Sequence, residues 1–125
     1  MTSRPRTIDL VFVIGLAALT NFAYFALSLN AIVCQQLVPR TDNSGRAVAV
    51  EVLLANHAVR NHIRNEKLQN LISEITVGKR QGMISLEDSL VRLVQQGAIT
   101  VEDARIRSAR QDEFESLMRG TRFGQ

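Results

Sequence analysis

Hydrophobic positions recur at helical spacing in the second half of the chain. A stripe at i, i+3, i+4 and i+7 predicts an amphipathic helix whose apolar members are Leu68, Leu71, Ile72 and Ile75. A second helix is expected to start at Ser85, with Asp88 as a variant of the capping box, and to end at Gly97. Its apolar face is expected to consist of Leu86, Leu90, Leu93 and Val94.

Two more helical segments are predicted towards the end of the chain. Thr100 with Asp103 repeats the start signal and predicts a helix that runs to about Arg110. The range 113–119 predicts a last short turn whose inward side chains are Phe114, Leu117 and Met118. Residues 119–125 are expected to form a flexible tail, and the glycines around Lys79 and Arg80 predict a loop between helices.

The pattern changes to β structure before these helices. A cluster of turn residues from Thr41 to Gly45 separates the range 36–40 from the valine-rich range 46–54, which together predict a β-hairpin. The range 31–37 fits either a helix or a strand, and Pro39 is expected to close it. The pattern as a whole predicts a mostly α fold with a small β-hairpin.

A short stretch after the hairpin carries two faces of different character. It reads Ala58-Val59-Arg60-Asn61-His62-Ile63-Arg64-Asn65, and Asn56 is placed to cap a helix there. One face is apolar because Val59 and Ile63 are one turn apart, and the other carries Arg60 and Arg64 at the same spacing. This helix is expected either to dock by its apolar face and contact a partner through its arginines, or to present an ordinary solvated charged face.

The N-terminal part contains a long apolar run. The run from Leu10 to Leu29 contains no charged residue. Its length is about that needed for a transmembrane helix. Arg4 and Arg6 precede it, so a cytoplasmic N-terminus is expected if the run inserts into a membrane. A signal peptide and a buried core helix are the other interpretations of an apolar N-terminal helix.

Composition narrows the classes of function. A chain of 125 residues forms one domain at most, and a net charge of +3 is too small to indicate nucleic-acid binding. Cys34 is the only cysteine, so we expect no disulfide, and its apolar neighbours predict a small buried side chain. His57 and His62 are five residues apart and face different sides of a helix, so we expect no metal site.

Catalytic motifs are missing from the sequence. The phosphate-binding pattern Gly-x-x-x-x-Gly-Lys-Ser/Thr is absent, since Gly78-Lys79 is followed by Arg80 and Ser73 stands five residues earlier. The acidic pairs Glu87-Asp88 and Glu102-Asp103 fall in the first turns of helices, where the helix dipole favours acids. We therefore predict no catalytic, cofactor-binding or metal-binding residues in this chain.

An ordered set of segments resembles a known family. The octapeptide 58–65 is similar to the Ala-Ile-Arg-Asn-Leu-Ile-Arg-Glu signature of the PilT/PilU-type retraction ATPases of type IV pili. These ATPases are members of the type II/IV secretion ATPase superfamily. It departs from the signature at His62, where the family has Leu, and at Asn65, where it has Glu. The segments that accompany it are 27–40, 47–54, 82–90 and 93–100.

The resemblance implies an architecture and a function. It covers about residues 27–118, which correspond to the C-terminal part of an α/β P-loop NTPase without its phosphate-binding core. Residues 1–26 do not match the family. Complete members use ATP and magnesium, form homo-hexamers in the cytoplasm at the inner membrane face, and act on the inner-membrane pilus platform. The octapeptide 58–65 would couple ATP hydrolysis to retraction.

Several hypotheses about the whole chain follow. In the first, it is a truncated or reframed product that keeps the coupling element of the motor and cannot hydrolyse ATP alone, because the Walker A and Walker B motifs are missing. The alternative is a small single-pass inner-membrane protein with a basic helical cytoplasmic domain that binds a partner. A helix-turn-helix DNA-binding domain around Gly97 is disfavoured, because the arginines there alternate with acids.

Overall fold

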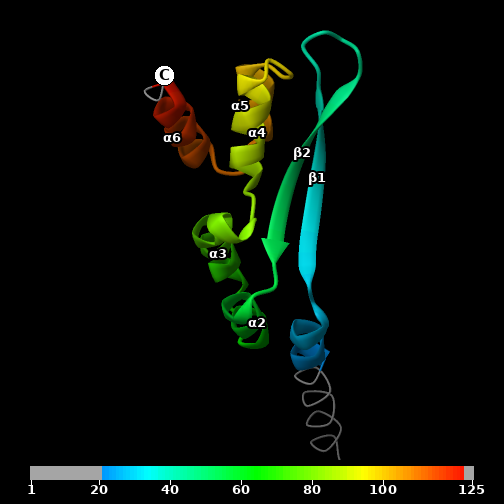
Figure 1. The fold of residues 1–125 in the computed structure, drawn as a ribbon, viewed down its shortest axis with the longest axis vertical. Coiled ribbons are helices and arrows are strands. Elements are labelled where there is room, and N and C mark those ends of the chain that lie inside the picture. The colour runs from blue at the N-terminus through cyan, green and yellow to red at the C-terminus, as the bar shows by residue number, and fades with distance from the viewer. Residues whose placement is uncertain (1–20, 123–125) are drawn as a thin grey trace, which may run out of the picture. The chain divides into compact units, whose positions relative to one another are not determined.

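The computed structural model describes residues 21–122 of the chain and divides it into two compact units (Figure 1). Of the described residues, unit 1 contains 21–30 and 55–74, and unit 2 contains 31–54 and 75–122. The described part is mostly helical with one two-stranded antiparallel sheet. This confirms the predicted fold class.

Unit 1 is built from short helices. Residues 21–28 are helical, followed after the hairpin by α2 (His57–Arg64), the 3₁₀ helix η1 (Leu68–Asn70) and the start of α3 (Leu71–Val77). Asn56 caps α2 as predicted, since its side-chain oxygen accepts a hydrogen bond from the backbone N–H of Val59 at 2.9 Å. Val59 and Ile63 are buried, so the apolar face of this helix is confirmed.

The hairpin belongs to unit 2 and is longer than predicted. Strands β1 (Ala31–Pro39) and β2 (Arg46–Leu54) pair in a regular antiparallel register from Ala31 opposite Leu54 to Pro39 opposite Arg46. The range 31–37 is therefore a strand. In the turn, a carboxylate oxygen of Asp42 accepts hydrogen bonds from the N–H and hydroxyl of Ser44.

Three helices complete unit 2. They are α4 (Leu86–Gln95), α5 (Val101–Arg107) and α6 (Gln111–Arg122), and the 3₁₀ helix η2 (Gly78–Gln81) occupies the predicted loop before them. Ser85 and Thr100 cap α4 and α5 as predicted. Gly97 adopts the left-handed conformation after α4, where it closes a Schellman motif, because Ala98 N–H donates to Leu93 O at 3.0 Å.

Two helix ends differ from the prediction. Helix α5 stops at Arg107 rather than near Arg110, because Ser108 turns to an extended conformation and residues 108–110 bind the Glu87 carboxylate instead. Helix α6 runs from Gln111 to Arg122, so the expected short turn 113–119 is in fact a longer helix. Phe114, in the first turn of α6, is fully buried, as expected.

The core of unit 2 forms between the hairpin and its helices. Helix α4 packs along β2 and against α6 (Figure 1). The buried side chains of this core come from both strands, all three helices and the connection between α4 and α5. They are Val38, Ala47, Ala49, Leu86, Leu90, Val91, Ile99, Ala104 and Phe114. The hydrophobic effect of this core is the main force that holds unit 2 together.

Two predictions about burial are wrong. Only Ile75 of the stripe 68–75 is buried, while Leu68 and Ile72 are 53% and 46% exposed, because η1 and α3 divide the expected helix into two short pieces. Cys34 is exposed, since the core of unit 2 covers Val38 further along the strand and does not reach Cys34.

The apolar N-terminal run lies mostly outside the described residues. Of the range 10–29, residues 10–20 are not described, and residues 21–28 are helical. Among residues 21–122, none of the helices has the length and apolar character of a membrane span.

Candidate functional site

Helix α2 holds the octapeptide 58–65 in unit 1. Its apolar face is anchored, because Val59 and Ile63 are 0% and 2% exposed. The remaining positions of the helix are half-buried or exposed. The structure thus separates an inward face from an outward face, as the sequence pattern predicted.

Arg60 does not lie on the outward face in the expected way. Its guanidinium donates hydrogen bonds to Ala55 O at 2.9 Å, to Ala26 O at 3.0 Å and to Leu27 O at 2.6 Å. Ala26 and Leu27 lie in the last turn of the helix 21–28, whose final carbonyls have no partner within the helix. Arg60 therefore caps that helix, and the prediction of an exposed Arg60 is wrong.

Arg64 is exposed, as predicted. Beside it, the Asn65 amide donates to the backbone oxygen of Asn61 at 2.9 Å and to its side-chain oxygen at 3.0 Å. These bonds fix the C-terminal end of α2. Of the two arginines that were expected to form a contact face, Arg64 alone offers its guanidinium to the outside.

His62 is partly buried rather than placed in an apolar pocket. Its Nε2 lies 3.1 Å from a carboxylate oxygen of Glu74, so the side chain that replaces the family's leucine is held by a polar partner. His57 at the start of α2 is exposed. Neither histidine belongs to a group of metal ligands among the described residues.

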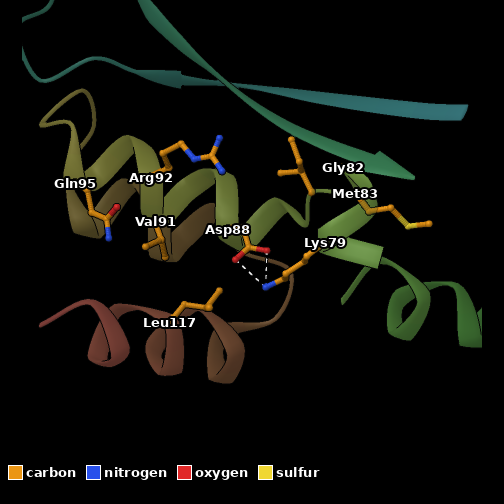
Figure 2. A pocket seen from close by; sticks show the side chains of 9 residues that line it. Lys79, Gly82, Met83, Asp88, Val91, Arg92, Gln95 and Leu117 are labelled. Carbon is orange, nitrogen blue, oxygen red and sulfur yellow. Dashed lines mark hydrogen bonds and ion pairs between the residues drawn. The ribbon is translucent and has the colours of Figure 1, made fainter. Parts of the chain in front are cut away.

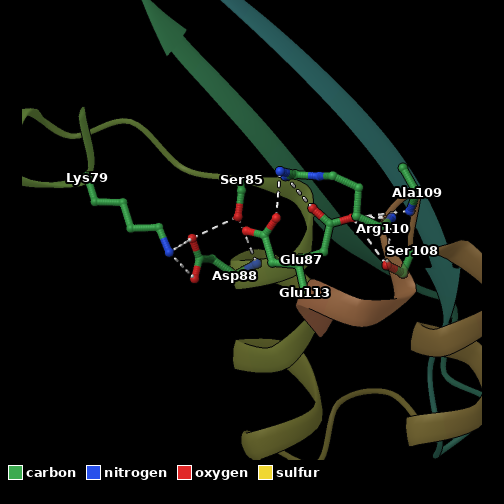
Figure 3. A network of polar contacts seen from close by, with 8 residues as sticks. All are labelled: Lys79, Ser85, Glu87, Asp88, Ser108, Ala109, Arg110 and Glu113. Atoms are coloured by element: carbon green, nitrogen blue, oxygen red, sulfur yellow. Dashed lines mark hydrogen bonds and ion pairs between the residues drawn. The ribbon is translucent and has the colours of Figure 1, made fainter. Parts of the chain in front are cut away.

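A buried carboxylate organises the helices of unit 2 (Figure 3). Glu87 is 0% exposed, and its Oε1 accepts hydrogen bonds from the Ser108 hydroxyl, the Ala109 N–H and the Arg110 N–H at 3.0–3.1 Å. Its Oε2 accepts from the Arg110 guanidinium at 2.7 Å. Glu87 thus joins the start of α4 to the start of α6, and both of its carboxylate oxygens have hydrogen-bond partners.

This network has an electrostatic effect on the hairpin. Burial raises the pKa of the Glu51 carboxyl on β2, and the negative charge of Glu87 raises it further. Arg110 opposes the shift in part. The arrangement consists of fixed charges that meet their partners, which is typical of a structural network rather than of a catalytic site.

An open cleft of about 480 Å³ lies beside the same helices in unit 2 (Figure 2). Lys79 donates to both carboxylate oxygens of Asp88 at 2.9 and 2.7 Å. Burial alone would raise the pKa of Asp88, but the hydrogen bonds from Lys79 and Ser85 outweigh it and lower that pKa. The residues that line the cleft are Lys79, Gly82, Met83, Ile84, Asp88, Val91, Arg92, Gln95 and Leu117.

The chemistry of this cleft is limited. Its lining contains no histidine, cysteine, serine or threonine, so the only side chains there of a nucleophilic type are Lys79 and Asp88. The Lys79 ammonium is already paired with Asp88. The cleft therefore gives no basis for assigning a reaction.

The comparison with solved structures places the fold. The chain superposes on the crystal structure of the pilus retraction motor PilT with bound ADP, with a TM-score of 0.66 and 33% identity, over 78% of this chain and 26% of that chain. The Legionella pneumophila ATPase DotB shares the fold at a TM-score of 0.52 and 18% identity, over 70% of this chain and 24% of that chain. The described fold therefore matches a part of each of these two proteins.

Curated sequences agree with the structural comparison. A twitching motility protein of Neisseria gonorrhoeae is 41% identical over 69 residues, which are 55% of this chain and 18% of that protein. The type IV pilus ATPase PilU of Pseudomonas aeruginosa is 40% identical over 71 residues, which are 57% of this chain and 19% of that protein. No protein-family model matches the chain.

These similarities confirm the resemblance read from the sequence. The chain carries a PilT/PilU-type pilus ATPase region. It spans less than a fifth of the length of the two curated relatives.

The contacts of two residues, Arg60 and Glu87, were not predicted from the sequence. Arg60 was assigned to the outward face by helical spacing, and its carbonyl partners lie 33 and 34 residues earlier in the chain. Glu87 was explained by the helix dipole alone, although its carboxylate is the centre of a buried network. The one available signal was a glutamate at helical spacing from the apolar Leu90 and Val94, with which it shares a face.

Proposed function

We propose that this chain acts as the C-terminal coupling part of a type IV pilus retraction motor, with the octapeptide 58–65 on α2 as the coupling element. The observation that carries the proposal is the division of α2 into a buried face, Val59 and Ile63, and an outward side that carries the exposed Arg64. An arginine held on an anchored helix offers a fork of charge-assisted hydrogen bonds to a carboxylate on a partner.

The proposal assigns different tasks to the two arginines. Arg64 contacts the partner, which is a neighbouring subunit of a homo-hexamer or the inner-membrane pilus platform. Arg60 holds the helix 21–28 to α2 by its bonds to Ala26 and Leu27 and so keeps the coupling element in place. The site of action is the cytoplasmic face of the inner membrane.

ATP and magnesium belong to the complete motor in this proposal and are not bound by the present residues. The sequence holds no phosphate-binding loop, and the cleft in unit 2 offers a lysine already paired with Asp88. In this proposal the present residues contribute the coupling element, and ATP hydrolysis takes place in other parts of the motor.

A chimeric motor tests the proposal. The matched region of the Neisseria gonorrhoeae twitching motility protein is replaced by the residues of this chain, and twitching is scored together with ATP hydrolysis by the purified motor. We expect Arg64→Ala to reduce twitching at least tenfold and to leave the ATPase rate within about twofold, since the lost contacts lie outside the nucleotide site. The purified chain alone is expected to hydrolyse no ATP.

Lys67→Ala is the matched control, because Lys67 is also an exposed cation of unit 1 and lies outside the octapeptide. It should leave twitching unchanged. Normal twitching in the Arg64→Ala chimera would remove the coupling role from α2. ATP hydrolysis by the chain alone would contradict the proposal that ATP is hydrolysed by the rest of the motor.

A second candidate is a single-pass inner-membrane protein with a helical partner-binding domain. The observation that favours it is the helix 21–28, which has no charge and exposes Phe22, Tyr24, Phe25 and Leu27. Aromatic side chains of this kind are enriched where a helix meets the membrane interface. Retention of the chain in membranes after carbonate extraction supports this candidate, and release contradicts it.

A further inference from the structure

Helix α2 is anchored on its inward side by a narrow apolar stripe. Val59 and Ile63 are buried and lie four positions apart, so they project within about 40° of each other around the helix axis. Two contacts that lie close to a single line resist rotation of a helix about its own axis only weakly. The direction in which the exposed Arg64 projects therefore depends on contacts at the two sides of α2.

One side of α2 is joined to the preceding helix of unit 1. Successive residues of an α-helix project about 100° apart, so Arg60 and Arg64 lie on the same side of Ile63. On that side the Arg60 guanidinium donates to Ala26 O at 3.0 Å and to Leu27 O at 2.6 Å. These bonds oppose rotation of α2 away from the preceding helix.

The opposite side of α2 makes a contact with α3. His62 projects about 100° from Ile63 in the other direction. Its Nε2 lies 3.1 Å from Oε1 of Glu74, which is in the first turn of α3 and twelve positions further along the same unit. An ionised carboxylate only accepts hydrogen bonds, so the imidazole N–H at Nε2 is the donor. The two side chains are 20% and 21% exposed, so water competes little for this bond.

We propose that Glu74 is a positioning residue for α2. Through its bond to His62 it opposes rotation of the helix from the side opposite Arg60, and together the two contacts fix the direction in which Arg64 projects. This inference rests on the proposed function, in which Arg64 contacts a partner. It adds a residue outside the octapeptide 58–65 to the coupling element.

The size of the displacement explains why a contact at the side of the helix matters. A helix with its side chains has an outer radius of about 5–6 Å, so a rotation by about 20° shifts the end of an exposed side chain by roughly 2 Å. A hydrogen bond of about 2.9 Å between donor and acceptor does not survive such a shift. The paired bonds of a guanidinium to a carboxylate depend on direction even more, because both must form in one plane.

Hydrogen exchange of the full chain tests the positioning without reference to the motor. We expect Glu74→Ala to raise the exchange rates of the amides in the last turn of α2 about tenfold and to leave those of α4 unchanged, which shows that the opening is local. Glu74→Gln should exchange like the wild type, because its amide oxygen is an acceptor at the same reach. Ser73→Ala, an exposed neighbour on α3, is the matched control. Unchanged exchange of α2 in Glu74→Ala overturns the inference.

A second pair of variants tests whether Glu74 acts through His62. His62→Ala and the double variant with Glu74→Ala should exchange at the same rates as Glu74→Ala alone, since all three lose one and the same contact. Rates in the double variant that are the product of the two single effects overturn the inference. Where Glu74→Ala does not fold, Glu74→Asp takes its place in both tests, because it keeps the charge and shortens the reach to His62.

The chimeric motor tests the consequence for coupling. Glu74→Ala should lower twitching about threefold or more and leave the ATPase rate within about twofold, and Glu74→Gln should twitch like the unchanged chimera. Normal twitching in Glu74→Ala beside a loss in Arg64→Ala overturns the inference and leaves the proposed function intact. Normal twitching in both variants contradicts the proposed function, and the role of Glu74 with it.

Discussion

At the scale of single residues, Arg60 and Arg64 show that helical spacing alone does not predict which contacts a side chain makes. They lie one turn apart on α2, and yet the Arg60 guanidinium binds three backbone carbonyls while Arg64 is exposed. A guanidinium suits the first role, because its rigid fork of donors reaches several acceptors at once. The difference leads to a direct test of stability.

We expect Arg60→Ala to lower the free energy of unfolding by about 2 kcal/mol, because bonds from a charged donor to otherwise unpartnered carbonyls are lost. Arg64→Ala is the matched control and should stay within about 0.5 kcal/mol of the wild type. Chemical denaturation followed by circular dichroism measures both. Equal stability of the two variants would mean that the Arg60 bonds contribute nothing to the fold.

At the scale of elements, the starts of helices were predicted better than their ends. Asn56, Ser85 and Thr100 all cap the helices that follow them, because an N-cap depends on residues within one turn. The end of α5 depends on Glu87, which lies 21 residues before Ser108. The prediction from neighbouring residues therefore extended α5 beyond its observed end at Arg107.

The two serine and threonine caps should differ in strength. Ser85 is fully buried, and its hydroxyl also donates to Asp88 at 2.8 Å, whereas Thr100 is exposed. We expect Ser85→Ala to cost about 2 kcal/mol and Thr100→Ala about 1 kcal/mol, since both lose a cap and only the hydroxyl of Ser85 makes its bonds in a fully buried position. Thermal melting of the two variants checks the order. A larger loss in Thr100→Ala would contradict it.

At the scale of the whole molecule, stability depends on a small number of buried side chains. The core of unit 2 gathers residues from β1, β2, α4, α5 and α6, and Leu90 lies within it with no exposed surface. Large apolar residues outside the core remain exposed, among them Ile106 on α5 at 72%. The free energy of unfolding of a small domain is only about 5–15 kcal/mol.

Leu90→Ala should therefore cost about 2–5 kcal/mol, through the loss of buried surface and the cavity that remains. This loss is large enough to unfold unit 2 at moderate temperature. Ile106→Ala in the same unit is the matched control and should change the free energy of unfolding by less than about 0.5 kcal/mol. Urea titration of both variants measures the difference, and a wild-type midpoint for Leu90→Ala would place that side chain outside the core.

The sequence by itself determined the features that depend on neighbouring residues. Periodicity and capping chemistry predicted the hairpin around residues 41–45, the caps at Ser85 and Thr100, and the buried face of Val59 and Ile63, because each signal lies within a few positions. The octapeptide 58–65 likewise indicated the PilT/PilU-type region without any structure, and the similar proteins confirmed it.

Only the tertiary structure decided which polar groups meet. Arg60 binds carbonyls more than thirty residues away, and Glu87 binds residues 108–110, and neither pairing leaves a periodic trace in the sequence. The contacts of Ile84 and Ser89 with β2 were equally hidden, because these residues lie far along the chain from the strand residues that they bind. Hydrogen-bond partners far apart in the chain are fixed by packing, which local patterns do not encode.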